Sequence, residues 1–207
     1  MAFVSGFSAG FKSASVKKNV SVKPSNMVMM AMSKSVPFLE VPKNCVGLPA
    51  SSEFDPLFLS NYIPVKYLQE SEIKHGRICM LAAVGILVQE QYTFGGSYFP
   101  KMLPYEAHAF YLKTGGMAQI LLFIAAFESL SFYAIKQMLD GGDRKPGQFF
   151  FDPLGLGKDP KAFEKFQANE VRNGRLAMLG VAGLLHNEFI NHTTAFETLQ
   201  HFKVLGQ

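Results

Sequence analysis

The sequence predicts an all-α membrane protein with three transmembrane helices, of which the first and third cross as a pseudo-twofold pair. Two observations lead to this fold class. Residues 114–135 form an apolar run with a single charge, and residues 72–90 and 170–188 repeat each other. A helix made of this run would be about 33 Å long, enough for the roughly 30 Å of hydrocarbon in a bilayer. Residues 193–205 add a short amphipathic segment, which predicts a C-terminal helix on the membrane surface.

The repeated segments align without a gap, 98 positions apart in the chain. A match this close indicates a true repeat, so the two helices should have equivalent roles. A shorter repeat, Phe-Asp-Pro-Leu, precedes each helix at 54–57 and at 151–154. The identical pairs within the helices are Glu72/Glu170, Gly76/Gly174, Arg77/Arg175, Met80/Met178, Leu81/Leu179, Gly85/Gly183, Leu87/Leu185 and Glu90/Glu188.

Charged residues at the head of each copy predict ion pairs between the two helices. Glu72 and Arg77 are five residues apart, so they point away from each other on one helix. In a pseudo-twofold pair of helices, Glu72 can instead meet Arg175, and Glu170 can meet Arg77. The alternative is that these charges lie at helix ends and reach into water. Four glycines are expected to let the two backbones approach each other, namely Gly76, Gly85, Gly174 and Gly183.

After such pairing, the same residues keep lone pairs that could hold a metal. His75 stands three residues after Glu72, and Asn173 stands three residues after Glu170, so each pair shares a helix face. Oxygen ligands suit Mg²⁺, and imidazole nitrogen suits several other metals. The repeat therefore predicts two matching positions for metal ligands.

These motifs resemble those of the chlorophyll-binding light-harvesting antenna family. The resemblance lies in Glu-x-x-His-x-Arg from Glu72 and in Glu-x-x-Asn-Gly-Arg-x-Ala-Met from Glu170, and it covers about residues 37–203. It implies that reciprocal pairs with Arg77 and Arg175 lock the helix crossing and that side chains ligate chlorophyll magnesium. The ligands it implies are Glu72, His75, Gln89, Gln119, Glu128, Glu170, Asn173, Asn187 and His201.

Some of these ligands have an alternative interpretation. Gln119 is equally compatible with a hydrogen bond to a neighbouring helix, and His201 with a solvated position on the surface helix. Asn187 stands where the family usually carries Gln and has His186 as its neighbour, so either residue fits the ligand. Glu128 is the sole charge of the apolar run, and a carboxylate in a bilayer requires a partner or a ligand.

The Phe-Asp-Pro-Leu repeats predict turns, because Asp-Pro followed by Gly is typical turn chemistry. The family resemblance implies that these loops also line the ends of two carotenoids, held in the grooves of the helix crossing. The first copy departs from the second in having Phe58 where Gly155 stands. The loop residues implied are Asp55, Pro56, Asp152, Pro153 and Leu154.

The three helices are expected at about residues 65–93, 114–136 and 161–191. The uncharged part of the first helix, residues 78–89, would be only about 18 Å long, too short to span a bilayer. The middle helix therefore decides the membrane assignment. Pairing of charges and tilt then let the outer helices span as well. One span separates the two copies, so they run in the same direction. Lys and Arg are concentrated on the side of the N-terminus, which predicts that this end faces the stroma.

The first 32 residues are expected to be a plastid transit peptide. They contain many serines, no acidic residue and no apolar run like that of a secretory signal. A disordered basic tail is the alternative. Five lysines before Glu40 account for the formal net charge of +4, so the basicity gives no indication of nucleic-acid binding. Residues 33–207 form the predicted antenna domain.

The sequence contains no arrangement typical of an enzyme, such as a Ser/His/Asp set or a phosphate-binding loop. The resemblance implies a light-harvesting antenna of the plastid thylakoid membrane. Its cofactors would be chlorophyll a and carotenoids or xanthophylls, with a second chlorophyll type left open. Its partners would be a photosystem core, neighbouring antenna subunits and thylakoid lipids. The runs ESEIKHGRICML and PFLE look most like the red-lineage branch associated with photosystem I.

Two other functions are compatible with the sequence. A photoprotective relative of the same fold would dissipate excitation, whereas a small helical transporter would need a polar path and usually an inverted repeat. The parallel repeat argues against the transporter. No acidic cluster for pH sensing is predicted at the far ends of the helices, because the acidic residues there are scattered in the sequence. They are Glu90, Glu106, Glu188 and Glu197.

Overall fold

A computed structural model describes residues 32–33 and 35–205, and this part of the chain is all-α. The predicted transit peptide, residues 1–32, lies outside the described residues except for Met32. Strand pairing within the described ranges is limited to two isolated bridges. The helices are α1 (Val65–Gln91), α2 (Pro104–Lys113), α3 (Gly116–Leu139), α4 (Pro160–Asn191) and α5 (Ala195–Leu205), with short 3₁₀ helices at Lys43–Cys45 and Leu59–Asn61.

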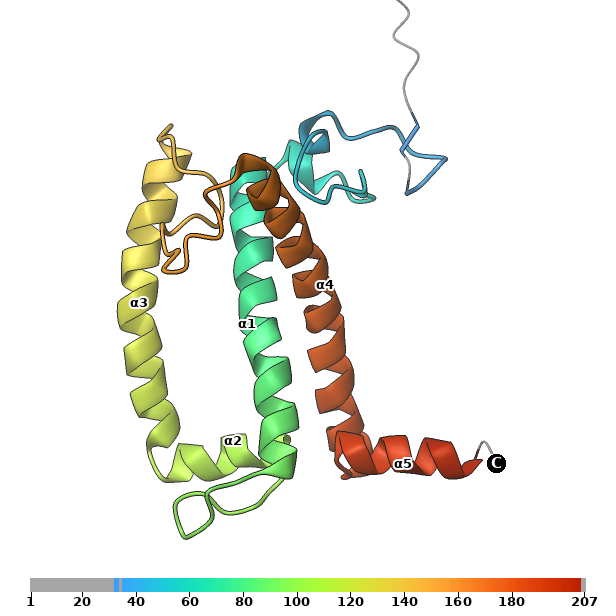
Figure 1. Cartoon of the computed structure of the whole chain (residues 1–207), viewed down its shortest axis with the longest axis vertical. Coiled ribbons are helices and arrows are strands. Elements are labelled where there is room, and N and C mark those ends of the chain that lie inside the picture. Colours follow the sequence, from blue (N-terminus) through green and yellow to red (C-terminus); the bar gives the residue numbers. More distant parts are fainter. Residues whose placement is uncertain (1–31, 34, 206–207) are drawn as a thin grey trace, which may run out of the picture. The chain divides into compact units, whose positions relative to one another are not determined.

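The three long helices run side by side, with α1 between α3 and α4 (Figure 1). The most extensive contact between helices is that of α1 with α4. The N-terminal ends of α1 and α4 lie at one end of these helices, and α2 and α5 lie across the other end. The bounds agree with the expected ranges to within three residues. The predicted all-α class is therefore confirmed.

Local sequence signals explain where the helices begin and end. Before Pro160, the carboxylate of Asp159 accepts a hydrogen bond from the amide of Lys161 at 3.2 Å and caps α4. The helix ends at His192, whose φ of 52° lies in the left-handed region. α3 follows Gly115, which has a φ of 79°. α2 is absent from the sequence-based expectation, because its ten residues are too few to show a clear helical period.

α3 is the one helix in the described part of the chain that is long and apolar enough to cross a membrane by composition alone, with a mean hydropathy of 1.7. Only 6% of its most apolar window is buried, unlike the core helix of a soluble protein. Large apolar side chains are also exposed on α1 and α4, for example Leu81 and Leu179. Apolar surface of this extent indicates contact with lipid or bound ligands.

α1 and α4 approach each other backbone to backbone at Gly76 and Gly174. The expectation that Gly85 and Gly183 also serve this approach is wrong. A Cβ atom added at either of them would have no atom within 4 Å. The reason is visible in Figure 1, where the two helices separate beyond their crossing. The close contact is thus confined to the first glycine of each copy.

Candidate functional site

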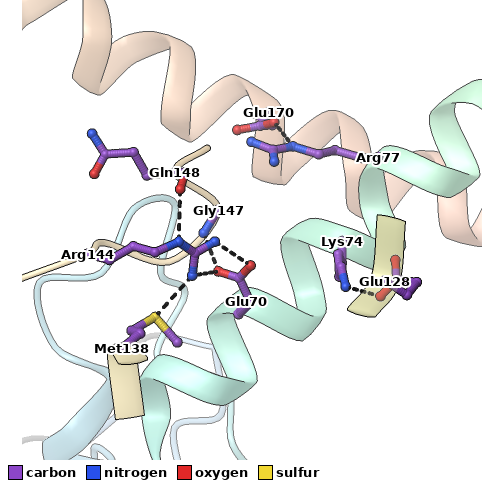
Figure 2. Close-up of polar contacts among 9 residues, drawn as sticks. All are labelled: Glu70, Lys74, Arg77, Glu128, Met138, Arg144, Gly147, Gln148 and Glu170. Carbon is purple, nitrogen blue, oxygen red and sulfur yellow. Dashed lines mark hydrogen bonds and ion pairs between the residues drawn. The ribbon is translucent and has the colours of Figure 1, made fainter. Parts of the chain in front are cut away.

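Two ion pairs connect α1 and α4 next to the glycine contact. Arg175 donates from Nε to Oε1 of Glu72 at 2.7 Å, and Arg77 donates from Nε to Oε1 of Glu170 at 2.7 Å. Figure 2 shows the second pair. These are the two pairs that the repeat predicts. Each arginine contacts its partner through one nitrogen, and within the described residues the Oε2 atom of each carboxylate accepts no hydrogen bond.

These spare oxygens have the chemistry of a magnesium ligand, because Mg²⁺ prefers carboxylate oxygen. The side chains of Glu72 and Glu170 are 35% and 32% exposed, so a ligand can reach them from outside the helix pair. The guanidinium partner fixes the direction of each carboxylate. The residues present therefore fit the magnesium of a bound chlorophyll.

His75 is oriented by its own helix. Its Nδ1 atom lies 2.7 Å from the backbone oxygen of Ser71, which can only accept a hydrogen bond. Nδ1 is therefore the donor, and in the neutral ring this tautomer leaves a lone pair on Nε2 for a metal. On α4 the equivalent residue, Asn173, is exposed and makes no side-chain hydrogen bond within the described part.

Glu128 has a partner that sequence reasoning missed. Its Oε2 atom forms an ion pair with Nζ of Lys74, which connects α3 to α1 (Figure 2). Oε1 accepts no hydrogen bond among the described residues and stays available as a ligand. Glu128, Lys74 and His75 all line a cavity of about 530 Å³ between α1 and α3. The structure thus brings two of the predicted ligands, His75 and Glu128, to one cavity.

The remaining predicted ligands lie apart from this cavity. Gln89 is half-buried near the end of α1, Gln119 is exposed near the start of α3, and His201 is exposed on α5. None of the three makes a side-chain hydrogen bond to another described residue. The alternative of a hydrogen bond from Gln119 to a neighbouring helix is therefore not observed.

Asn187 is occupied by its neighbours. Its Nδ2 atom donates to Oγ1 of Thr198 on α5 at 2.9 Å, and its Oδ1 atom accepts from Nδ2 of Asn191 at 2.8 Å. His186, by contrast, is exposed and has no hydrogen-bond partner in the described residues. The geometry therefore favours His186 as the free ligand at this end of α4 and gives Asn187 a role in attaching α5.

The two Phe-Asp-Pro-Leu loops have the same fold. Asp55 accepts hydrogen bonds from the amides four and five residues later, Leu59 and Ser60, both at 3.0 Å. Asp152 does the same with Leu156 at 3.1 Å and Gly157 at 2.9 Å. Phe58 and Gly155, which occupy equivalent positions, both have left-handed φ values, 53° and 66°. The loop thus keeps its conformation despite the change from Gly to Phe.

These hydrogen bonds shift the acidity of both carboxylates. Burial alone would raise the pKa of Asp55, but hydrogen bonds from Ser60 and Leu59 hold that pKa below its usual value. The amides of Gly157 and Leu156 lower the pKa of Asp152 in the same way, against a smaller effect of burial. Both groups are therefore expected to be ionised under ordinary conditions.

Two cavities flank the crossing of α1 and α4. The first cavity, about 460 Å³, lies between α1, α4 and the loop of residues 45–60. The second cavity, about 980 Å³, lies between the same helices and the loop of residues 145–152. Asp55 lines the first cavity and Asp152 the second, whereas Pro56, Pro153 and Leu154 line neither.

Comparisons with known proteins identify the family of the chain. The sequence pattern of one family, described as Chlorophyll A-B binding protein, matches residues 41–189. The chain belongs to the chlorophyll a-b binding protein family. The chain is 32% identical to light-harvesting complex stress-related protein 1, chloroplastic, of Chlamydomonas reinhardtii, over 93% of this chain and 80% of that protein.

Two further relatives are named as chlorophyll-binding proteins. A fucoxanthin-chlorophyll a-c binding protein of Chattonella marina var. antiqua is 31% identical, over 80% of this chain and 79% of the relative. The photosystem I chlorophyll a/b-binding protein 3-1 of Arabidopsis thaliana is 27% identical, over 74% of this chain and 68% of the relative. The family predicted from the motifs is therefore confirmed, and these relatives are named as light-harvesting or chlorophyll-binding proteins.

This member of the chlorophyll a-b binding family also contains a buried ion pair that sequence reasoning missed. The guanidinium of Arg144, in the loop after α3, contacts both carboxylate oxygens of Glu70 on α1, at 2.8 and 3.2 Å (Figure 2). The side chain of Glu70 is 1% exposed and that of Arg144 10%. Glu70 has no repeat partner, since Ala168 stands 98 positions later, so the repeat gave no signal for it.

Two buried carboxylates lie at the far ends of α1 and α4 in this chlorophyll a-b binding protein. Glu90 and Glu188 are 7% and 0% exposed. Glu90 accepts a hydrogen bond from the amide of Ala195 at 3.0 Å, and the Glu188 carboxyl interacts electrostatically with Glu90 and with Tyr105 of α2. The expectation that these carboxylates are scattered is wrong for this pair. Equivalent positions on two helices that run in the same direction lie at the same level.

Proposed function

We propose that the chain is a light-harvesting antenna protein of the plastid thylakoid membrane, which binds chlorophyll and carotenoid and transfers excitation energy to a photosystem. The observation that carries this proposal is the paired crossing, in which Glu72 and Glu170 each keep a spare oxygen beside His75 and Asn173. Membership in the chlorophyll a-b binding family supports it, as do the names of chloroplastic relatives.

In this proposal α1, α3 and α4 all cross the membrane, with the N-terminus on the stromal side and α5 on the opposite surface. α1 has 27 residues and α4 has 32, which corresponds to about 40 and 48 Å and therefore to tilted spans. The charges of α1 and α4 near the crossing are tolerated because they neutralise each other. The parallel repeat supports a pseudo-twofold axis between α1 and α4, along the membrane normal.

The residues of this chain would fix the distance and orientation of each pigment. Bound chlorophyll supplies the absorption of light and the transfer of excitation. Chlorophyll a is the expected pigment, and carotenoids or xanthophylls would occupy the first and second cavities. The proposed magnesium ligands are Glu72, His75, Gln89, Gln119, Glu128, Glu170, Asn173 and His201, with His186 or Asn187 at the far end of α4.

Photosystem I is the proposed partner core, together with neighbouring antenna subunits and thylakoid lipids. The sequence runs typical of the red-lineage branch support this choice, and one relative is named as a photosystem I protein. A second candidate function is dissipation of excess excitation. Several relatives named as stress-related, at 31 and 32% identity, favour it.

Purification of the full chain with its pigments tests the proposal. We expect bound chlorophyll with a carotenoid excitation band that leads to chlorophyll emission. A long excited-state lifetime would support light harvesting, and a short lifetime would support dissipation. A colourless protein from pigment-containing cells would overturn both, and would revive the transporter that the parallel repeat disfavours.

A further inference from the structure

The loops that wall the two cavities are fastened in different ways. At the first cavity, Nη1 of Arg175 donates to the backbone oxygen of Ala50 at 3.0 Å, so the arginine of the helix crossing also holds the loop. Its repeat partner, Arg77, makes no such bond to the loop of the second cavity in the part of the chain that the structure describes. That loop is fastened by Glu70 and Arg144 instead.

The fastening at the second cavity is a closed network. Beside its two contacts with Glu70, Arg144 donates from Nε to the backbone oxygen of Gln148 at 2.9 Å, and its guanidinium lies 4.7 Å from the ring centre of Phe149. Oε2 of Glu70 also accepts a hydrogen bond from the backbone amide of Gly147 at 2.5 Å (Figure 2). Three consecutive wall residues, 147–149, are therefore held directly by this pair.

The network lies behind the wall of the second cavity. Gly147, Gln148 and Phe149 line this cavity, whereas Arg144 lines none of the three cavities described above. Glu70 lines the cavity between α1 and α3 and not the second cavity. The wall also lies close against α1 at Gly147. A Cβ atom on Gly147 would already lie 2.9 Å from Cδ1 of Ile73 on α1. The ion pair thus holds the loop where it lies against α1.

We propose that Glu70 and Arg144 are a positioning pair, which shapes the second cavity for a carotenoid without taking part in the helix crossing. This inference rests on the proposed function, since it assigns the cavity to a pigment. It makes the two carotenoid sites unequal. Loss of Arg175 would disturb the crossing and the first cavity together, whereas loss of Arg144 would disturb the second cavity and leave the pairs of the crossing in place.

The energetics favour a local effect. A buried carboxylate that loses its arginine is left uncompensated, which is far more costly than the loss of an exposed pair. Movement of residues 147–149 away from α1 would expose Glu70 on the side of the second cavity, since its carboxylate accepts the hydrogen bond of the Gly147 amide. The crossing at Gly76 and Gly174 uses none of the atoms in this network, so the two pairs next to that glycine contact should remain.

The test uses the full chain refolded with chlorophyll a and zeaxanthin, a carotenoid with a hydroxyl group on each end ring. Arg144→Gln removes the ion pair. Arg144→Lys keeps the positive charge but loses the planar guanidinium that contacts both carboxylate oxygens of Glu70. The control is Asp143→Asn, which changes the charge of the same loop at an exposed position. We expect the ratio of zeaxanthin to chlorophyll to fall by about half in Arg144→Gln, because one of two cavities empties, and to fall less in Arg144→Lys.

Amide hydrogen exchange gives a second readout that does not depend on pigment. Exchange at Gly147 should be about tenfold faster or more in Arg144→Gln, the factor expected for a weakened hydrogen bond to a charged group. An unchanged zeaxanthin ratio in Arg144→Gln would overturn the inference. So would a loss of chlorophyll in proportion to zeaxanthin, since the pair would then support the crossing.

These results separate the inference from the proposed function. If the unaltered chain bound no pigment, the proposed function would fail, and the carotenoid assignment would fail with it. Exchange at Gly147 would then still show whether Arg144 holds the loop. If the unaltered chain bound both pigments and only the zeaxanthin ratio stayed constant in the variants, the inference alone would fail.

Discussion

A Cβ atom on Gly76 would lie 2.9 Å from the Cα atom of Gly174, and a Cβ atom on Gly174 would lie 3.0 Å from the Cα atom of Gly76. The two backbones therefore meet with no space for any side chain between them. The ion pairs of Glu72 with Arg175 and of Arg77 with Glu170 depend on this distance, because they join the same two helices. Helix separation at the glycines would lengthen both pairs at once.

We predict that Gly76→Ala lowers the stability of the pigmented protein by about 1–3 kcal/mol, the usual cost of overpacking. The matched control is Gly85→Ala on the same helix, where a Cβ atom would meet nothing within 4 Å. That change should be neutral or should stabilise the helix by up to about 1 kcal/mol. Thermal unfolding followed by helical circular dichroism measures both. Equal effects of the two substitutions would show that α1 and α4 do not meet at Gly76.

A second prediction compares the two arginines of the crossing. Arg175→Leu should be more damaging than Arg77→Leu, because Arg175 also holds the carbonyl oxygen of Ala50. The difference should be about 1.5–3 kcal/mol, the range for a hydrogen bond that involves a charged group. Both variants leave a carboxylate without its partner, so both should lose chlorophyll. Pigment content and unfolding temperature of the two purified variants provide the measurement. A reversed order would contradict the unequal fastening of the two loops.

The crossing could be predicted from the sequence because the two helices that form it, at residues 72–90 and 170–188, repeat the same motif. Each copy contains a glutamate and an arginine that cannot pair within one helix, and the repeat supplies the second helix. The spacing, which is the same in both copies, then predicts which residues meet. In both pairs the arginine Nε lies 2.7 Å from the glutamate Oε1. The helix ranges follow from the same patterns together with the apolar run of α3.

Contacts without a repeat could not be predicted. Lys74 pairs with Glu128 on another helix, and Glu70 pairs with Arg144 in a loop, yet nothing in the sequence selects one distant charge over another. The expected close approach at Gly85 and Gly183 was wrong for a related reason. Gly85 repeats as well as Gly76 does, but two straight helices that cross can touch at only one level, and the sequence does not say which.

A third prediction concerns the far end of α4. His186→Leu should lower the chlorophyll content, because His186 is exposed without a hydrogen bond and can offer its ring nitrogen. Asn187→Leu should instead lower the free energy that holds α5 against α4 by about 1–3 kcal/mol, because it removes the hydrogen bond to Thr198 on α5. It also removes the bond to Asn191 within α4. Thr198→Val is the control, and it should reproduce the effect of Asn187→Leu on hydrogen exchange in α5. Loss of chlorophyll in Asn187→Leu but not in Thr198→Val would return the ligand role to Asn187.

The fourth prediction is a pH dependence of the two loops. The pKa of Asp152 lies below its usual value of 3.8, because the ionised carboxylate accepts hydrogen bonds from the amides of Gly157 and Leu156. A lowered folded-state pKa stabilises the loop at pH values above the unfolded pKa, and this stabilisation is lost as the pH falls through the folded value. Protection of the Gly157 amide from exchange, corrected for its intrinsic rate, should therefore be constant above about pH 5 and decline below pH 4. Asp152→Asn should abolish the decline, while the Asp55 loop of the same variant should retain it through Ser60 and serves as an internal control. Equal protection at pH 3 and pH 7 in the unaltered chain would show that the carboxylate of Asp152 does not hold this turn.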